Sequence, residues 1–112
     1  MKLNHINLTV TDVNAARKFL ETYFGLKTNS TRGDSFAVLL DEDGLLLSLT
    51  KGKEVSYPKT FHIGFSQESE EQVNKINQHL KEDGFNVKPP QSLHRYTFYV
   101  KAPGGFTVEV HS

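Results

Sequence analysis

The chain has 112 residues and a formal net charge of zero, since thirteen basic residues balance thirteen acidic ones. Its length allows one domain with a substantial core, and its scattered Lys and Arg residues do not form the basic field of a nucleic-acid-binding protein. It has no cysteine, which excludes thiol nucleophiles, disulfides and thiolate metal sites and leaves histidine and carboxylate as strong metal ligands. No apolar run has the length of a signal peptide or a membrane span, so we expect a cytoplasmic protein without a membrane partner.

The first half of the chain predicts a strand, a helix and three further strands. Residues 3–10 alternate apolar and polar side chains, with His5 on the polar face. Asp12 is placed to cap a helix, and Gly25 is placed to end it. Three further strands are predicted at 27–31, 35–40 and 45–50, because turn-type segments separate these runs.

The second half repeats this order. Residues 60–66 predict a strand with His62 on its polar face, and helical spacing follows until about Asp83 and Gly84. Further strands are predicted at 86–88, 95–101 and 105–111, and the polar segment 51–59 reads as a linker because it contains Gly and Pro. We therefore predict one domain, 1–112, made of two repeats that cover about 1–53 and 58–112.

The repeat brings candidate metal ligands into equivalent positions. His5 and His62 lie at the start of each half, and aligning Gly44 with Gly105 places Ser48 opposite Glu109. Equivalent strands of a duplicated fold carry equivalent faces, so these four side chains should line comparable positions. A lone histidine on a strand is usually structural or exposed, but the recurrence of two on a face shared with a carboxylate favours a metal site.

Four local segments of the sequence, taken in this order and spacing, resemble the vicinal oxygen chelate superfamily, which includes glyoxalase I, extradiol dioxygenases and the fosfomycin and bleomycin resistance proteins. The segments are Leu3-Asn4-His5-Ile6, Tyr23-Phe24-Gly25-Leu26, Phe61-His62-Ile63-Gly64-Phe65 and the run from Tyr99 through Pro103-Gly104-Gly105 to Glu109. The resemblance implies an α+β fold of two βαβββ modules, which form a curved sheet around a central cavity. It also implies one divalent metal ion per site, either Mn, Fe, Ni, Zn or Co, bound by His5, His62 and Glu109.

The sequence departs from individual branches of that family. Glyoxalase I usually has a Glu at the position of Ser48, and a neutral hydroxyl is a weaker ligand than a carboxylate. The His, His, Glu set is instead that of the fosfomycin-modifying thiol transferases. However, Asn7 replaces the threonine expected two residues after the first histidine, and residues 89–93 lack an evident phosphonate-binding loop. Neither activity is favoured outright.

Two imidazoles and one carboxylate leave coordination positions open on a divalent ion, which can then act as a Lewis acid on an oxygen-chelating substrate. In this interpretation Tyr99 is an acid or hydrogen-bond donor and Arg95 is an anion clamp. The remaining substrate-binding candidates, which act beside Tyr99, are Asn7, Ser48 and Thr97. The predicted function is therefore a metal-dependent lyase, dioxygenase or thiol transferase acting on a small molecule. The alternative is a metal-free protein that sequesters a ligand, as the bleomycin resistance proteins do.

The resemblance also implies a homodimer, because small two-module chains of the family commonly form their sites between subunits. His5 of one chain would then join His62 and Glu109 of the partner subunit. Exposed sheet edges give a physical reason for association, since a dimer covers unpaired backbone groups.

Overall fold

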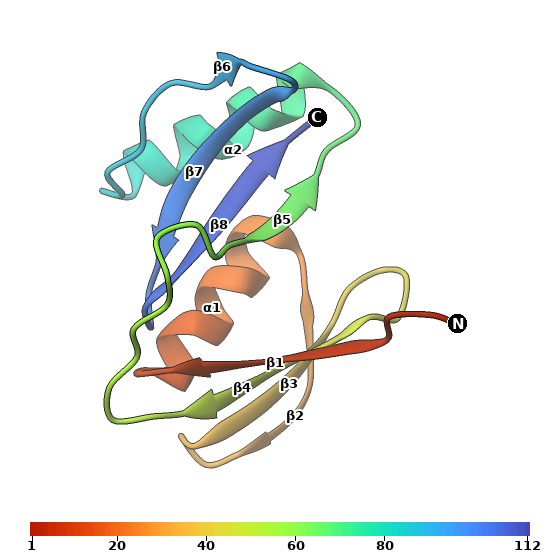
Figure 1. Ribbon diagram of the computed structural model, residues 1–112, viewed down its shortest axis with the longest axis vertical. Helices are drawn as coiled ribbons and strands as arrows, with labels where there is room; N and C mark the ends of the chain where they lie inside the picture. Colours follow the sequence, from red (N-terminus) through yellow and green to blue (C-terminus); the bar gives the residue numbers. More distant parts are fainter. The chain divides into compact units, whose positions relative to one another are not determined.

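The computed structural model describes residues 1–112. The chain forms two compact units, one of residues 1–57 with 103–105 and the other of residues 58–102 with 106–112. Each unit contains one helix and one four-stranded sheet (Figure 1). The predicted α+β fold of two βαβββ modules is confirmed. The single-domain organisation stays a prediction. No helix combines the length and the apolar character that crossing a membrane requires.

The elements of the first unit follow the predicted order: β1 (His5–Val10), α1 (Val13–Phe24), β2 (Lys27–Arg32), β3 (Phe36–Leu40) and β4 (Leu46–Lys51). The sheet order is β1-β4-β3-β2, with β1 parallel to β4 and the other pairs antiparallel. Alternate residues of β1 and β4 are buried, and α1 packs against β4, β3 and β2. One face of the sheet is therefore covered by the helix, and the other carries the polar residues.

Helix α1 begins and ends where the sequence predicts. The Asp12 side chain accepts a hydrogen bond of 2.9 Å from the Ala15 backbone N–H, which satisfies a donor that the first helical turn leaves unpaired. Gly25 ends the helix with φ at 69°, a left-handed conformation that glycine adopts without steric cost. The helix places Val13, Ala16 and Leu20 in the core.

The elements of the second unit are β5 (Ile63–Ser66), α2 (Glu70–Glu82), β6 (Gln91–Ser92), β7 (Tyr96–Ala102) and β8 (Phe106–His111). Their sheet order is β5-β8-β7-β6, with β5 parallel to β8 and the other pairs antiparallel. Helix α2 packs against β7 and β8. Strand β5 begins one residue after His62, so this histidine lies at the entrance to the strand rather than within it.

The strand predicted at 86–88 is wrong. Residues 86–88 have no regular structure, and the edge strand of this sheet is instead the short β6. The Lys88 carbonyl oxygen accepts a hydrogen bond of 2.9 Å from the Asn77 side-chain amide of α2. Pro89 and Pro90 follow directly, and neither has an N–H to donate to a neighbouring strand. Pairing with β7 therefore starts only after the two prolines.

The two sheets share the same internal register. In the first, Asn7 of β1 pairs with Ser48 of β4, and in the second, Gly64 of β5 pairs with Glu109 of β8. Counting back two residues from Asn7 and from Gly64 reaches His5 and His62. The structure thus supports the predicted equivalence of Ser48 with Glu109 and of His5 with His62.

The turn between β7 and β8 belongs to the first unit. Its Gly104 carbonyl oxygen accepts a hydrogen bond of 3.0 Å from the Thr11 backbone N–H. Gly104 has φ at 98°, and a Cβ atom there would lie 2.9 Å from the Val10 Cβ. Both the backbone conformation and the close approach to β1 require glycine at this position.

Candidate metal centre

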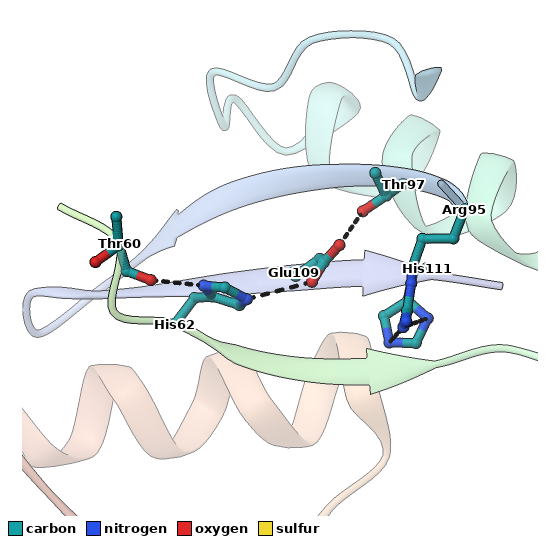
Figure 2. Close-up of polar contacts among 6 residues, drawn as sticks. All are labelled: Thr60, His62, Arg95, Thr97, Glu109 and His111. Carbon is teal, nitrogen blue, oxygen red and sulfur yellow. Dashed lines mark hydrogen bonds and ion pairs between the residues drawn. The ribbon is translucent and has the colours of Figure 1, made fainter. Parts of the chain in front are cut away.

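His62 is held with one ring nitrogen committed to the backbone. Its Nδ1 lies 2.9 Å from the Thr60 carbonyl oxygen (Figure 2). A carbonyl oxygen can only accept a hydrogen bond, so Nδ1 carries the proton in the neutral ring. The lone pair is then on Nε2, as it is in histidines that bind metals through Nε2 and donate through the other nitrogen.

Glu109 lies on the strand next to β5 and meets this lone pair. Its Oε1 lies 3.3 Å from the Nε2 of His62, and its Oε2 accepts a hydrogen bond of 2.7 Å from the Thr97 hydroxyl (Figure 2). Glu109 is only 8 % exposed and Thr97 only 4 %. The carboxylate is thus nearly removed from water, with one oxygen fixed by Thr97 and the other directed at His62.

The charge state of Glu109 suits a ligand. Burial alone raises the pKa of a carboxyl group. The hydrogen bond from Thr97 outweighs this effect, together with the charges of His111 and His62 and a hydrogen bond from Tyr99, and the pKa of Glu109 lies below its ordinary value. The group is therefore ionised near neutral pH.

Two hydrogen-bond acceptors consequently face each other across 3.3 Å when the His62 ring is neutral. This arrangement is repulsive unless a cation satisfies both. The cation is either a proton on Nε2, which makes the ring an imidazolium, or a metal ion bound by Nε2 and Oε1. Imidazole nitrogen and carboxylate oxygen are both ligands of Zn²⁺ and similar divalent ions, so these residues fit such an ion.

Tyr99 lies beside this pair. Its ring meets the His62 ring edge-on, with 5.4 Å between ring centroids and 87° between planes, while 46 % of the residue is exposed. Desolvation raises the pKa of the Tyr99 hydroxyl, and the negative charge of Glu109 raises it further. The hydroxyl therefore keeps its proton near neutral pH and can act as a hydrogen-bond donor to a bound ligand.

Arg95 contacts the face of an imidazole ring. Its Nη1 lies 3.2 Å from Nδ1 and 3.3 Å from Nε2 of His111 (Figure 2). An atom equidistant from both ring nitrogens at this range lies above the ring, because an in-plane approach would clash with the carbon between them. The Nη1 group of Arg95 therefore lies over the face of the His111 ring.

The first unit arranges a neutral counterpart of this face. His5 Nδ1 lies 2.7 Å from the Asn4 side-chain oxygen, which leaves Nε2 of His5 with the lone pair. The Asn7 side-chain oxygen accepts hydrogen bonds of 2.7 Å from Ser48 and 2.9 Å from Thr50. No carboxylate takes part in these contacts.

The predicted site residues thus fall into two groups. The second unit brings together His62, Glu109, Thr97, Tyr99 and Arg95, and the first holds His5, Asn7 and Ser48. No group of three or more His, Cys, Asp or Glu side chains lies close enough to hold a metal ion, so the three-ligand set with His5 stays a prediction.

Sequence analysis missed two contributors. The Thr60 carbonyl, which orients His62, is a backbone group that no sequence pattern marks. The contact of Arg95 with His111 depends on side-chain torsions. The sequence signal that could have pointed to it is the alternation that places Arg95, Thr97 and His111 on polar faces, Thr97 and His111 being paired in register. The predicted role of Thr97 in substrate binding stays a prediction, and its hydroxyl proton is directed to Glu109.

A polar hollow of about 200 Å³ lies elsewhere, at the start of α1. It is lined by residues 11–14, Asp34 and Lys51. Lys51 Nζ and Asp34 Oδ2 are 3.7 Å apart and both side chains are more than half exposed, so this pair contributes little to stability. The hollow contains none of the predicted site residues.

Comparison with known proteins identifies the family. The model of the Glyoxalase/Bleomycin resistance protein/Dioxygenase superfamily matches residues 2–110. The chain belongs to this superfamily. The glyoxalase-superfamily fold is also found in a solved structure described as "a possible Glyoxalase from Bacillus cereus", which is 67 % identical, has a TM-score of 0.98 and matches 100 % of this chain and 99 % of its own.

Two relatives have described activities. A "Probable trivalent organoarsenical cleaving enzyme" of Bacillus subtilis is 32 % identical over 85 residues, and the match spans 76 % of this chain but only 58 % of that protein. The fosfomycin resistance protein FosX of Listeria innocua is 30 % identical over 95 residues, which spans 80 % of this chain and 71 % of that protein. A FosX mutant of Listeria monocytogenes, solved with Mn(II) and 1S,2S-dihydroxypropylphosphonic acid, is 25 % identical with a TM-score of 0.84, over 98 % of this chain and 90 % of that one.

Proposed function

We propose that this glyoxalase-superfamily chain is a divalent-metal-dependent enzyme that acts on a small oxygen-chelating molecule. His62 and Glu109 would hold the ion with His5 as the third ligand. The observation that carries the proposal is the pair of acceptors, Nε2 of His62 and Oε1 of Glu109, held 3.3 Å apart by separate hydrogen bonds to Thr60 and Thr97. Outer hydrogen bonds of this kind orient the ligands of metal sites.

The candidate reactions are those of a lyase, a dioxygenase or a thiol transferase. When bound, a divalent ion with open coordination positions polarises a substrate oxygen and stabilises negative charge that develops on it. Residues of the chain would bind and orient the substrate. Tyr99 would donate a hydrogen bond to the substrate through a hydroxyl whose raised pKa keeps it protonated, and Asn7 and Ser48 are further proposed substrate-binding residues.

The relatives bear on the identity of the metal ion and on the class of substrate. Mn(II) in the FosX structure supports a divalent ion, and the other candidates are Fe, Ni, Zn and Co. A trivalent arsenic compound is a less suitable substrate, because a soft centre prefers thiolate and this sequence has no cysteine. We therefore propose a substrate whose oxygen atoms reach the metal, in a cytoplasmic enzyme.

Metal uptake tests the proposal. Protein stripped on a chelating resin is titrated with Mn²⁺, and wild type is compared with His62→Gln and Glu109→Gln. Loss of either ligand should weaken binding by at least about tenfold, since even outer-sphere changes cost ten- to a hundredfold. His79→Gln is the matched control, because His79 Nε2 lies at the same 3.3 Å from the carboxylate of Asp83, the residue that caps the end of α2. If wild type binds Mn²⁺ no better than the two ligand variants, the protein is not this metal enzyme, and ligand sequestration becomes the favoured function.

A homodimer with shared sites is the second part of the proposal. Complementation tests for shared sites. His5→Gln protein is mixed with Glu109→Gln protein and allowed to exchange subunits. If each site combines His62 and Glu109 with His5 of the partner subunit, every heterodimer regains one intact site and Mn²⁺ binding partly returns. If the mixture binds no more Mn²⁺ than the separate variants, shared sites are refuted.

A further inference from the structure

The strongest feature outside the metal ligands is Arg95, an arginine with no acidic partner on a face that holds a buried carboxylate. It forms no ion pair, and its side chain contacts the ring of His111. Holding an exposed arginine in one position costs side-chain entropy and gains little stability. A guanidinium held over a ring beside a candidate site is therefore better explained by ligand binding.

This contact leaves the Nε and Nη2 donors of Arg95 available. Only Nη1 faces the ring, at 3.2 and 3.3 Å from its nitrogens. The Nε and Nη2 donors point along the guanidinium plane, which is the edge that binds a carboxylate or phosphonate through two parallel hydrogen bonds. The His111 ring is partly buried and lies beside Gly64, where a Cβ atom would be 3.6 Å from its Nε2.

The strand register sets the spacing between this group and the candidate metal ligands. Glu109 and His111 lie on the same face of β8, two residues apart, which corresponds to about 6.6 Å along a strand. His62 approaches Glu109 from one side and His111 lies on the other (Figure 2). A small molecule bound to an ion at His62 and Glu109 would therefore lie near His111 and the Arg95 guanidinium that contacts it.

We infer that His111 is a positioning residue that holds Arg95 ready for an oxyanion, and that the substrate is a small organic acid carrying a carboxylate or phosphonate beside its metal-binding oxygen. The substrate class rests on the proposed function, while anion binding at Arg95 does not. Charge supports the class: a divalent ion with Glu109 and Arg95 leaves an excess of positive charge that an anionic substrate neutralises.

Anion titration of metal-free protein tests the inference without any catalytic readout. The chain has three arginines, Arg17, Arg32 and Arg95, so their side-chain Nε signals can be followed separately by NMR. Inorganic phosphate and acetate are the two probes. We expect the Arg95 signal to move in a saturable way with at least one of the two probes.

Variants separate positioning from mere charge. Arg95→Gln should abolish the saturable binding, whereas Arg32→Gln, the loss of an exposed arginine in the other unit, should leave it unchanged. His111→Phe keeps a ring under Arg95 and should bind within about twofold of wild type, while His111→Ala should bind about two- to fivefold more weakly, the range expected of an exposed cation–ring contact. A wild type that binds neither probe better than Arg95→Gln, or equal binding by His111→Ala and His111→Phe, overturns the inference. Phosphate or acetate binding that persists while Mn²⁺ uptake fails would instead remove the proposed function and leave the anion site standing.

Discussion

Replacing Thr97 with valine isolates the hydrogen bond that holds the Glu109 carboxylate. The substitution keeps the branched shape and removes the donor, so Oε2 of Glu109 loses its 2.7 Å partner at a site where both residues are nearly inaccessible to water. A hydrogen bond to a charged group contributes about 1.5–3 kcal/mol. The added buried methyl group returns about 0.8 kcal/mol. We therefore expect Thr97→Val to lower the free energy of unfolding by about 1–2 kcal/mol at pH 7.

The pH dependence of that loss provides the sharper test. The Thr97 hydroxyl lowers the pKa of Glu109 in the folded state, so its contribution is present above the unfolded pKa and disappears as the pH falls through the folded pKa. Urea unfolding of metal-free protein at pH 7 and at about pH 3 should therefore show a large difference between wild type and Thr97→Val at the higher pH and a small one at the lower.

Thr107→Val is the matched control, because Thr107 lies on the same face of β8 as Glu109 and its side chain has no hydrogen bond. It should change stability little at either pH. The reasoning is refuted if Thr97→Val costs as much at the acidic pH as at pH 7, or if it costs no more than Thr107→Val.

Three further predictions concern the same fold. Glu109→Gln should flatten the acid limb of the stability curve, since wild type loses the contribution of the ionised carboxylate as the pH drops through its lowered folded pKa; parallel urea titrations that keep the same slope in both proteins would contradict this. Gly104→Ala should destabilise by at least about 1–3 kcal/mol, because φ is 98° and the new Cβ would meet Val10, and thermal unfolding should show a larger loss than for Gly84→Ala, where φ is 91° but the space is open. Asn77→Ala removes the hydrogen bond to the Lys88 carbonyl and should cost about 1 kcal/mol, with faster amide exchange around residue 88 as its local signature.

The sequence was sufficient to predict the repeat and the pairing of equivalent positions in its two halves. Both follow from alternation with period two and from glycines at turns, and these signals depend on the backbone alone. The equivalence of Ser48 and Glu109 in the two halves was found by aligning Gly44 with Gly105. It needed only the number of residues between each turn and its strand.

Two other features could not be predicted from the sequence pattern. Residues 86–88 carry a strand-like signal, but the Lys88 carbonyl pairs with Asn77 from a helix that precedes it by several residues, and a tertiary contact of this kind overrides local preference. The orientation of His62 by the Thr60 carbonyl is equally invisible, because every residue has a carbonyl and only the folded chain selects one.

The two units use one register for two different electrostatic purposes. At the position of Glu109 the first unit has Ser48, whose hydroxyl donates to the Asn7 side chain and leaves that face neutral. At the position of Asn7 the second unit has Gly64, and its missing side chain gives the His111 ring room beside Glu109. The negative charge of a carboxylate offsets the lost hydration of a divalent ion, and of the two faces only the second supplies one. The duplicated fold should therefore bind one metal ion per chain rather than two, with His5 adding a lone pair but no charge.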